Sequence, residues 1–277
     1  MTVTSLSALA AGIQRTLNSQ NSRVANNVNA LVTGNRLVQA STDVAALSTA
    51  VGLQNQTTGL RAASLNIAQA SSFLQVADGG AQQIGESLDR LNALAVQANN
   101  GALSDENRAQ LNQEFQALRA DINRTAQNTQ FNGQRLLDGS LASGASPAQF
   151  QVGSESSDNF SVEVPDLSDA ALFGTGNVDL LSQANAAAAL NAVRGAQNIV
   201  TSARADIGAF QNALEFAQAN VESAIANQEA ARASLADTDF ASASTESAQA
   251  RVGQQASIAL LAQSNRMPAN ILALLNE

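Results

Sequence analysis

The sequence predicts a mainly α protein: a long, antiparallel coiled-coil helical rod with a small β-hairpin insert. Three observations lead to this prediction. Apolar residues recur at intervals of seven over most of the chain, which is the pattern of helices that pack knob into hole. Aromatic residues make up only 3% of the 277 residues and are all Phe, whereas a compact globular core contains more aromatic mass. Only three Pro residues occur, so long stretches lack the strongest helix breaker.

The heptads are clearest in two segments. In the first half of the chain, one register is Leu53, Leu60, Ile67, Leu74, Ala81, Leu88 and Ala95, and the second is Gln56, Ala63, Ala70, Ala77, Ile84, Leu91 and Ala98. In the second half, steps of three and four give Ile207, Phe210, Leu214, Ala217, Val221, Ala224, Gln228, Ala231 and Leu235, with Gln228 as the polar exception. Because Ala is small, two helices that pack through these positions can approach closely.

These patterns predict five helices, over about residues 5–33, 43–99, 105–128, 181–235 and 240–277. Thr42 and Ser104 are suited to cap the second and third helices, and Asp237 or Asp239 to cap the last. The second helix should continue through Gly79 and Gly80, because the heptads stay in phase across them. Each glycine costs about 1 kcal/mol relative to Ala in a helix.

The segment between the third and fourth helices differs in composition. Gly, Ser and carboxylates increase, and no Arg is present between residues 138 and 180. The runs AQFQV and NFSVEV alternate apolar and polar residues around GSESSD, which predicts a β-hairpin within about residues 141–180. A calcium site is the more specific alternative for these acidic residues. However, no run in this segment has acidic residues at positions 1, 3 and 5 followed by a bidentate Glu.

Several residue types that enzymes and cofactor sites need are absent. The chain has no Cys, His or Lys, which excludes thiolate chemistry, the commonest general base and Schiff-base chemistry. Glu114 and Asp121 could be considered as paired carboxylates, but their spacing on a helix fits a solvated face better. We therefore expect no enzymatic activity, no cofactor and no metal.

Other partners are disfavoured by charge and hydropathy. The net charge of −9 argues against nucleic acid as a main partner. No window approaches the ~20 apolar residues that cross a bilayer, so we expect no membrane insertion. The first residues do not have the basic start and apolar stretch of a secretory signal.

The two terminal helices have narrow apolar stripes that need another protein surface to cover them. We expect assembly contacts on the first helix at Leu6, Leu9, Ile13, Leu17, Val24, Val28 and Leu31. On the last helix we expect them at Ile258, Leu261, Ile271, Leu272, Leu274 and Leu275. One stripe does not stabilise a lone helix in water, because most helix stability in proteins comes from packing.

Two long segments and both ends resemble bacterial flagellin, the subunit of the flagellar filament. The first segment runs from LDRLNALAVQANNG to TQFNGQRLLDG, and the second from ESAIANQEAARASLADTDF to the end. The closing pattern consists of Asn265, Pro268, Asn270, Leu272, Leu274 and Leu275. The similarity covers almost the whole chain. It departs from the family at the start, which reads TVTS, and the middle of the chain has room only for the hairpin.

The resemblance implies an architecture and an assembly. Residues 1–41 with 237–277 would pair as a terminal helical coiled coil in the filament core. Residues 42–236 would form the next shell outward. The subunit would be exported without a cleaved signal and polymerise into an extracellular helical filament for motility, and its terminal helices would become ordered on assembly.

The resemblance also implies partners besides the chain itself. These are a flagellar export chaperone, the filament cap and hook-associated proteins. The stretch containing Arg90, Leu94 and Glu114 corresponds to the one that a host flagellin receptor contacts in related flagellins. We expect the native role of these three residues to be contact between subunits, with recognition by a host receptor incidental to it. Two alternatives share parts of this design: a hook–filament junction protein and a cell-surface, glycan-binding flagellin homologue.

Overall fold

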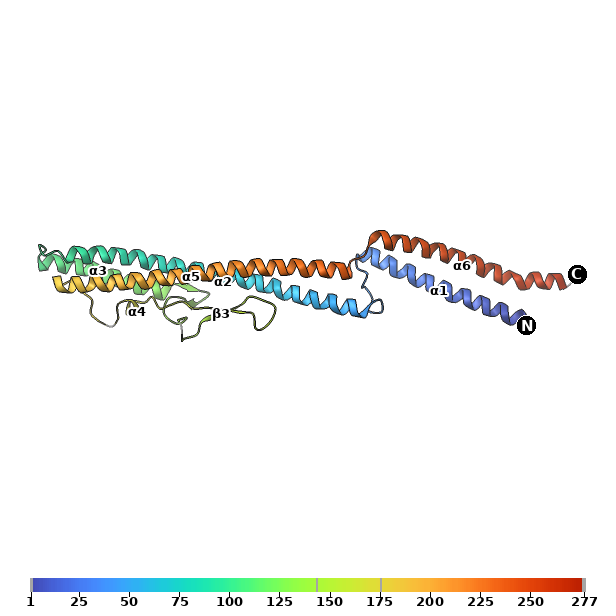
Figure 1. Ribbon diagram of the computed structural model, residues 1–277, viewed down its shortest axis with the longest axis horizontal. Coiled ribbons are helices and arrows are strands. Elements are labelled where there is room, and N and C mark those ends of the chain that lie inside the picture. The colour runs from blue at the N-terminus through green and yellow to red at the C-terminus, as the bar shows by residue number, and fades with distance from the viewer. Residues whose placement is uncertain (1, 143, 175, 276–277) are drawn as a thin grey trace. The chain divides into compact units, whose positions relative to one another are not determined.

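The computed structural model describes residues 2–142, 144–174 and 176–275, and within these ranges the side chains of residues 8–266. It divides into two compact units, which we describe separately (Figure 1). Unit 1 is Met1–Asn55 with Asn227–Glu277, and unit 2 is Gln56–Ala226.

The fold class is confirmed as mainly α. The elements in chain order are α1 (Thr2–Thr33), α2 (Val44–Ala98), α3 (Asp105–Asn128), β1 (Gln130–Phe131), β2 (Gln134–Arg135), β3 (Ala148–Gln151), β4 (Asn159–Val162), α4 (Asp169–Phe173), α5 (Gln183–Ala236) and α6 (Phe240–Leu275). All five expected helices are present. The short α4 and the β1–β2 pair were not expected as regular elements. The expected domain boundaries at 41/42 and 236/237 fall in the breaks between α1 and α2 and between α5 and α6, both within unit 1.

In unit 2, α2 and α5 run antiparallel. Side-chain hydrogen bonds connect them at three described residue pairs: Gln197 to Asp89 at 2.7 Å, Arg204 to Asp78 at 2.8 Å and Gln218 to Ser64 at 2.9 Å. As the residue number rises on α5, the partner's number falls on α2. The antiparallel arrangement expected from the heptads is therefore present in this unit.

The heptad positions form a large part of the core of unit 2, together with buried residues of the segment between α3 and α5 and of the first half of α5. Both registers of α2 are buried from Leu60 onward, while Leu53 is half-buried and Gln56 is exposed. On α5, Ile207, Leu214 and Val221 are buried. α3 adds Phe115, Ile122 and Ala126, all fully buried. The small residues of the seam leave room for this third helix beside the pair.

Gly80 has no space for a side chain in this core. A Cβ atom at Gly80 would lie 2.6 Å from the Thr129 hydroxyl oxygen and 2.7 Å from a methyl group of Leu137. A Cβ atom at its neighbour Gly79 would meet nothing within 4 Å. α2 continues through both glycines, as the heptads predicted.

Two hairpins follow α3. β1 and β2 pair antiparallel around Asn132 and Gly133, whose φ angles of 50° and 82° are those of a tight turn. β3 and β4 form the hairpin that the sequence predicted, with Phe150 opposite Phe160. Edge-to-face contacts attach this hairpin to the helices: Phe150 lies 5.4 Å from Phe73 on α2, and Phe160 lies 5.9 Å from Phe210 on α5.

In unit 1, α1 and α6 lie side by side (Figure 1). Gln254 donates a hydrogen bond to Asn21 at 2.8 Å, and the Thr238 hydroxyl donates to the Ala30 carbonyl at 3.3 Å, so the helices are antiparallel. The α1–α2 link is tied to the end of α5 by an Asn35–Asp237 bridge.

The caps agree with the sequence at two positions and differ at one. Ser104 caps α3, and the Asp239 carboxylate accepts from the backbone N–H groups of Ala241 and Ser242 at the start of α6. The expected cap at Thr42 is wrong, because Asp43 accepts from the Ala46 N–H at 2.9 Å and α2 begins one residue later. Asp is as good an N-cap as Thr, so composition alone did not separate the two positions.

Candidate assembly surfaces

The expected contact residues of α1 are incompletely covered within the chain. Leu9 is 53% exposed, whereas Ile13, Leu17, Val24, Val28 and Leu31 are half-buried against α6. Val32, which was not among the predicted contacts, is 81% exposed. Leu6 lies in α1, but its side chain is outside the described residues.

The seam of α6 consists of small and polar residues. The buried positions are Ser247, Ala250, Ser257 and Ser264, at steps of seven and three, and Leu261 is half-buried. Gly253 adds a close approach, since a Cβ there would lie 3.2 Å from the Gln20 amide nitrogen of α1. This seam was not predicted, because the expected contacts were chosen among large apolar residues. The spacing of Ser and Ala by three and seven residues was the feature of the sequence that could have predicted it.

Apart from Leu261, three large apolar residues of α6 lie outside that seam. The exposed fractions are 66% for Val252, 51% for Ile258 and 54% for Leu260. At about 100° per residue, these three side chains leave the helix in three different directions. The side chains of the remaining expected contacts, Ile271, Leu272, Leu274 and Leu275, are outside the described residues.

In unit 2, the structure brings together two of the three residues of the expected receptor-contacting stretch. Arg90 on α2 donates to the Glu114 carboxylate on α3, with N–O distances of 2.6 and 2.9 Å, and both side chains are exposed. Leu94 is only 2% exposed and belongs to the core. Its side chain is therefore not available to a partner in this conformation, although it supports the surface that carries the ion pair.

Two buried arginines hold the end of unit 2 together, and neither was predicted from the sequence. Arg108 donates to the carbonyls of Ala98 and Asn100, both at 3.0 Å, which satisfies the C-terminal end of α2. Arg119 makes a bidentate contact with Asp169 at the start of α4. These contacts order the α2–α3 turn and the segment around α4.

Two titratable groups of unit 2 have shifted pKa values. Hydrogen bonding from the Ser140 side chain, together with the Ser140 N–H at 3.1 Å and the nearby Arg135 charge, lowers the pKa of Asp138. The hydrogen bond to Asp78 raises the pKa of Arg204, which links α5 to α2. Both shifts result from contacts within unit 2 and favour the charged form of each group.

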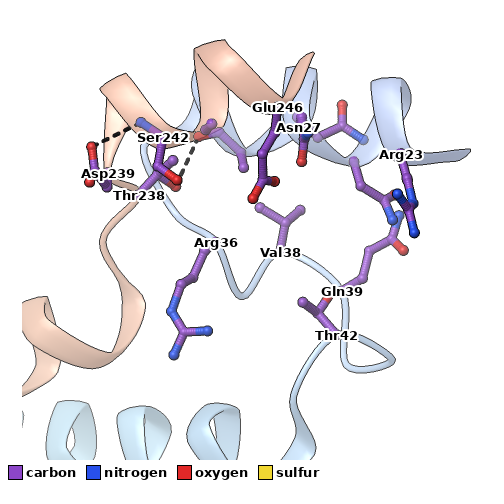
Figure 2. Close-up of a pocket in the computed structure, with 14 residues that line it drawn as sticks. Arg23, Asn27, Arg36, Val38, Gln39, Thr42, Thr238, Asp239, Ser242 and Glu246 are labelled. Carbon is purple, nitrogen blue, oxygen red and sulfur yellow. Dashed lines mark hydrogen bonds between the residues drawn. The ribbon is translucent and has the colours of Figure 1, made fainter. Parts of the chain in front are cut away.

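A cavity of about 360 Å³ lies in unit 1 between α1, the α1–α2 link and the start of α6 (Figure 2). Most of its lining residues are of polar type, including Arg23, Asn27, Arg36, Gln39 and Glu246, although apolar atoms contribute the larger part of its surface. Within the part of the chain that the structure describes, no group of three or more acidic side chains could hold a metal ion. None of the described helices has an apolar stretch sufficient to cross a membrane.

Comparison with known proteins places these features in a family. The sequence matches the bacterial flagellin N-terminal helical region over residues 5–142 and the bacterial flagellin C-terminal helical region over residues 190–275. It is 32% identical to the flagellar filament 30.7 kDa core protein of Treponema maltophilum, over 95% of each chain. It is 33% identical to flagellin of Bacillus subtilis, over 94% of this chain and 95% of that protein.

Solved structures agree with these sequence relatives. The crystal structure of Bacillus cereus flagellin aligns with a TM-score of 0.51 at 25% identity, covering 57% of this chain and 88% of that one. A putative flagellar hook-associated protein from Vibrio parahaemolyticus has a TM-score of 0.58 over 71% of this chain and all of its own, but at 16% identity it shares only the fold. The family matches, the relatives over nearly the full length and the helical architecture together place this chain in the bacterial flagellin family, whose members are structural proteins and not enzymes.

Proposed function

We propose that this chain is a structural subunit that polymerises into the extracellular flagellar filament for motility. The observation that carries the proposal is the distribution of Val252, Ile258 and Leu260 on α6, because α1 covers only one side of that helix. Apolar side chains exposed in three directions need more than one neighbour to bury them. A contact between two different patches that does not close into a ring extends into a helical fibre, which is the assembly of a filament.

We infer that α1 and α6 become fully ordered only when neighbouring copies cover them. Their mutual seam of Ser, Ala and half-buried aliphatic residues removes little apolar area from water. Burial contributes about 25 cal/mol per Å² of apolar surface, so a few hundred Å² covered on assembly supplies several kcal/mol toward the ordering entropy. Residues 1–41 with 237–277 would then form the inner layer of the filament, and residues 42–236 the layer outside it.

Further partners follow from this function as proposals. An export chaperone would shield the apolar end of α6 before secretion, and the cap and hook-associated proteins would contact the subunit at the ends of the filament. The exposed Arg90–Glu114 pair offers a charged surface for a neighbouring subunit or for a host flagellin receptor. No observation favours the glycan-binding alternative.

Truncation tests the proposal. We expect removal of residues 1–33 or 240–277 to abolish filament formation, measured by sedimentation and negative-stain electron microscopy, while unit 2 keeps its helical circular dichroism. Normal polymerisation of either truncated chain would contradict the proposal. A hook–filament junction protein should instead stop at short oligomers in the full-length state, so long fibres formed by the purified protein separate the two functions.

A further inference from the structure

The arginines of the two units differ in whether they have carboxylate partners. In unit 2, six arginines form ion pairs within the chain: Arg90, Arg108, Arg119, Arg124, Arg135 and Arg204. In unit 1, Arg15, Arg23, Arg36, Arg232, Arg251 and Arg266 have no ion pair among the described residues. Among the described residues, the arginines of unit 1 therefore have no carboxylate within ion-pair distance.

The charge distribution along the chain shows which part of it has an excess of carboxylates. Residues 1–42 contain Arg15, Arg23 and Arg36 and no Asp or Glu. Outside residues 56–226, arginines and carboxylates are equal in number, so the whole net charge of −9 lies on unit 2. Each copy thus has an acidic unit and a terminal unit with unpaired arginines, which is charge complementarity between different parts of the same polypeptide.

Arg23 and Arg36 line the cavity of unit 1, where a carboxylate of a partner could bind. Figure 2 shows Arg23 reaching from α1 toward Gln39, and Arg36 extending from the link on the side away from α6. Side-chain amides of Asn26 and Asn27 supply further donors in the lining. Each guanidinium can by itself donate two parallel N–H groups to one carboxylate, so Arg23 and Arg36 offer two separate binding positions for a partner's acidic side chains.

The two carboxylates in the lining leave these arginines available. Asp239 is engaged in capping α6, where it accepts from two backbone N–H groups. The Glu246 carboxylate points toward Val38 (Figure 2) and makes no ion pair with Arg23 or Arg36. Among the described residues, the cavity thus contains no ion pair between its arginines and its carboxylates.

We propose that Arg23 and Arg36 bind carboxylates of unit 2 of a second copy and thereby connect adjacent subunits. This inference rests on the proposed polymerisation and names one of its contacts. Acidic units brought close together in a polymer repel one another, and pairing with arginines of neighbours offsets part of that repulsion.

The absence of Lys permits a direct test by zero-length crosslinking. In full-length Arg36→Lys or Arg23→Lys chains, the new side-chain amine is the only one present apart from the α-amino group, and the charge is retained. Filaments grown from a mixture of ¹⁵N-labelled and unlabelled chains are treated with a carbodiimide, digested and analysed by mass spectrometry. We expect mixed-isotope amide links from these positions to Asp or Glu of residues 56–226. Links only to Glu246 or Asp239, or no mixed links in intact filaments, would overturn the inference.

Polymerisation itself provides the second test. Exposed ion pairs are weak, so we expect Arg23→Gln/Arg36→Gln to raise the critical concentration for polymerisation by roughly threefold to tenfold at ~0.05 M NaCl, and by much less at ~0.5 M NaCl. Arg194→Gln removes an exposed arginine of unit 2 and should leave the value within about twofold. An equal effect of both changes, or no effect of the double variant, would refute the contact. If the wild-type chain forms no polymer, it is the proposed function that fails.

Discussion

Arg119 on α3 and Asp169 at the start of α4 form a bidentate ion pair, with N–O distances of 2.9 and 2.8 Å, although they are 50 residues apart. Arg119 is only 8% exposed, and its guanidinium also lies 4.9 Å from the centre of the Phe173 ring. The pair therefore fixes the segment after the β3–β4 hairpin on the helical core of unit 2.

Removing one partner of this pair should destabilise unit 2. Asp169→Ala leaves the Arg119 charge buried without a counter-charge, and we expect a loss of about 2–3 kcal/mol, measured by urea unfolding followed by circular dichroism. Asp121→Ala, which breaks the exposed pair with Arg124, is the control and should cost less than about 0.5 kcal/mol. Equal effects of the two changes would show that burial does not govern the Arg119 contact.

The glycine pair of α2 offers neighbouring substitutions with opposite expected signs. Gly80→Ala would force a methyl group against Thr129 and Leu137 and should cost about 1–3 kcal/mol. Gly79→Ala adds a methyl group in open space and should stabilise the helix by about 0.5–1 kcal/mol. Melting temperatures of the two variants compared with the wild type check this; a stabilising Gly80→Ala would mean that the α2–α3 approach is looser than described.

Asp138 gives a pH-dependent prediction. Because its pKa is lower in the folded state, the ionised group stabilises the fold above the unfolded value of about 3.9, and this contribution is lost as the pH falls through the folded pKa. Asp138→Asn should thus be less stable than the wild type at pH 7, by roughly 0.5–1 kcal/mol, the size of a typical hydrogen bond. As the pH decreases, the free energies of unfolding of the wild type and of Asp138→Asn should converge. A difference that persists at the lowest pH would assign the effect to packing instead of charge.

The exposed apolar residues of α6 should matter for assembly and not for the isolated subunit. We expect Ile258→Asp or Val252→Asp to leave the unfolding of the monomer within about 0.5 kcal/mol of the wild type, as for other surface substitutions. Both should strongly reduce filament formation in a sedimentation assay, since a charge would enter a buried interface. Gln255→Asp adds the same charge at an exposed polar position of α6 and should reduce filament formation less, because no apolar side chain is lost with it. Unaffected polymerisation of all three would argue against burial of α6 by neighbours.

The sequence alone determined the long helices and the part of the core of unit 2 that the heptad positions of α2 and α5 form. The registers of Leu60 to Ala98 on α2 are buried as the heptads predicted, because a seven-residue repeat keeps the same stripe of a helix facing its neighbours. The hairpin of β3 and β4 followed from strict alternation around a polar turn. The absence of Cys, His and Lys likewise excluded most catalytic chemistry by composition alone, because the side chains that carry it do not occur in the chain.

Contacts between residues distant in sequence were decided only by the tertiary structure. Nothing in the local pattern shows that Arg119 would meet Asp169, that Leu94 would be buried while Arg90 and Glu114 form an exposed pair, or that Gly80 rather than Gly79 would lack space. Periodicity specifies which face of a helix is covered, because that depends on residues close in the chain. Which side chain covers it, and which charges remain without partners, depends on how separate elements pack in three dimensions.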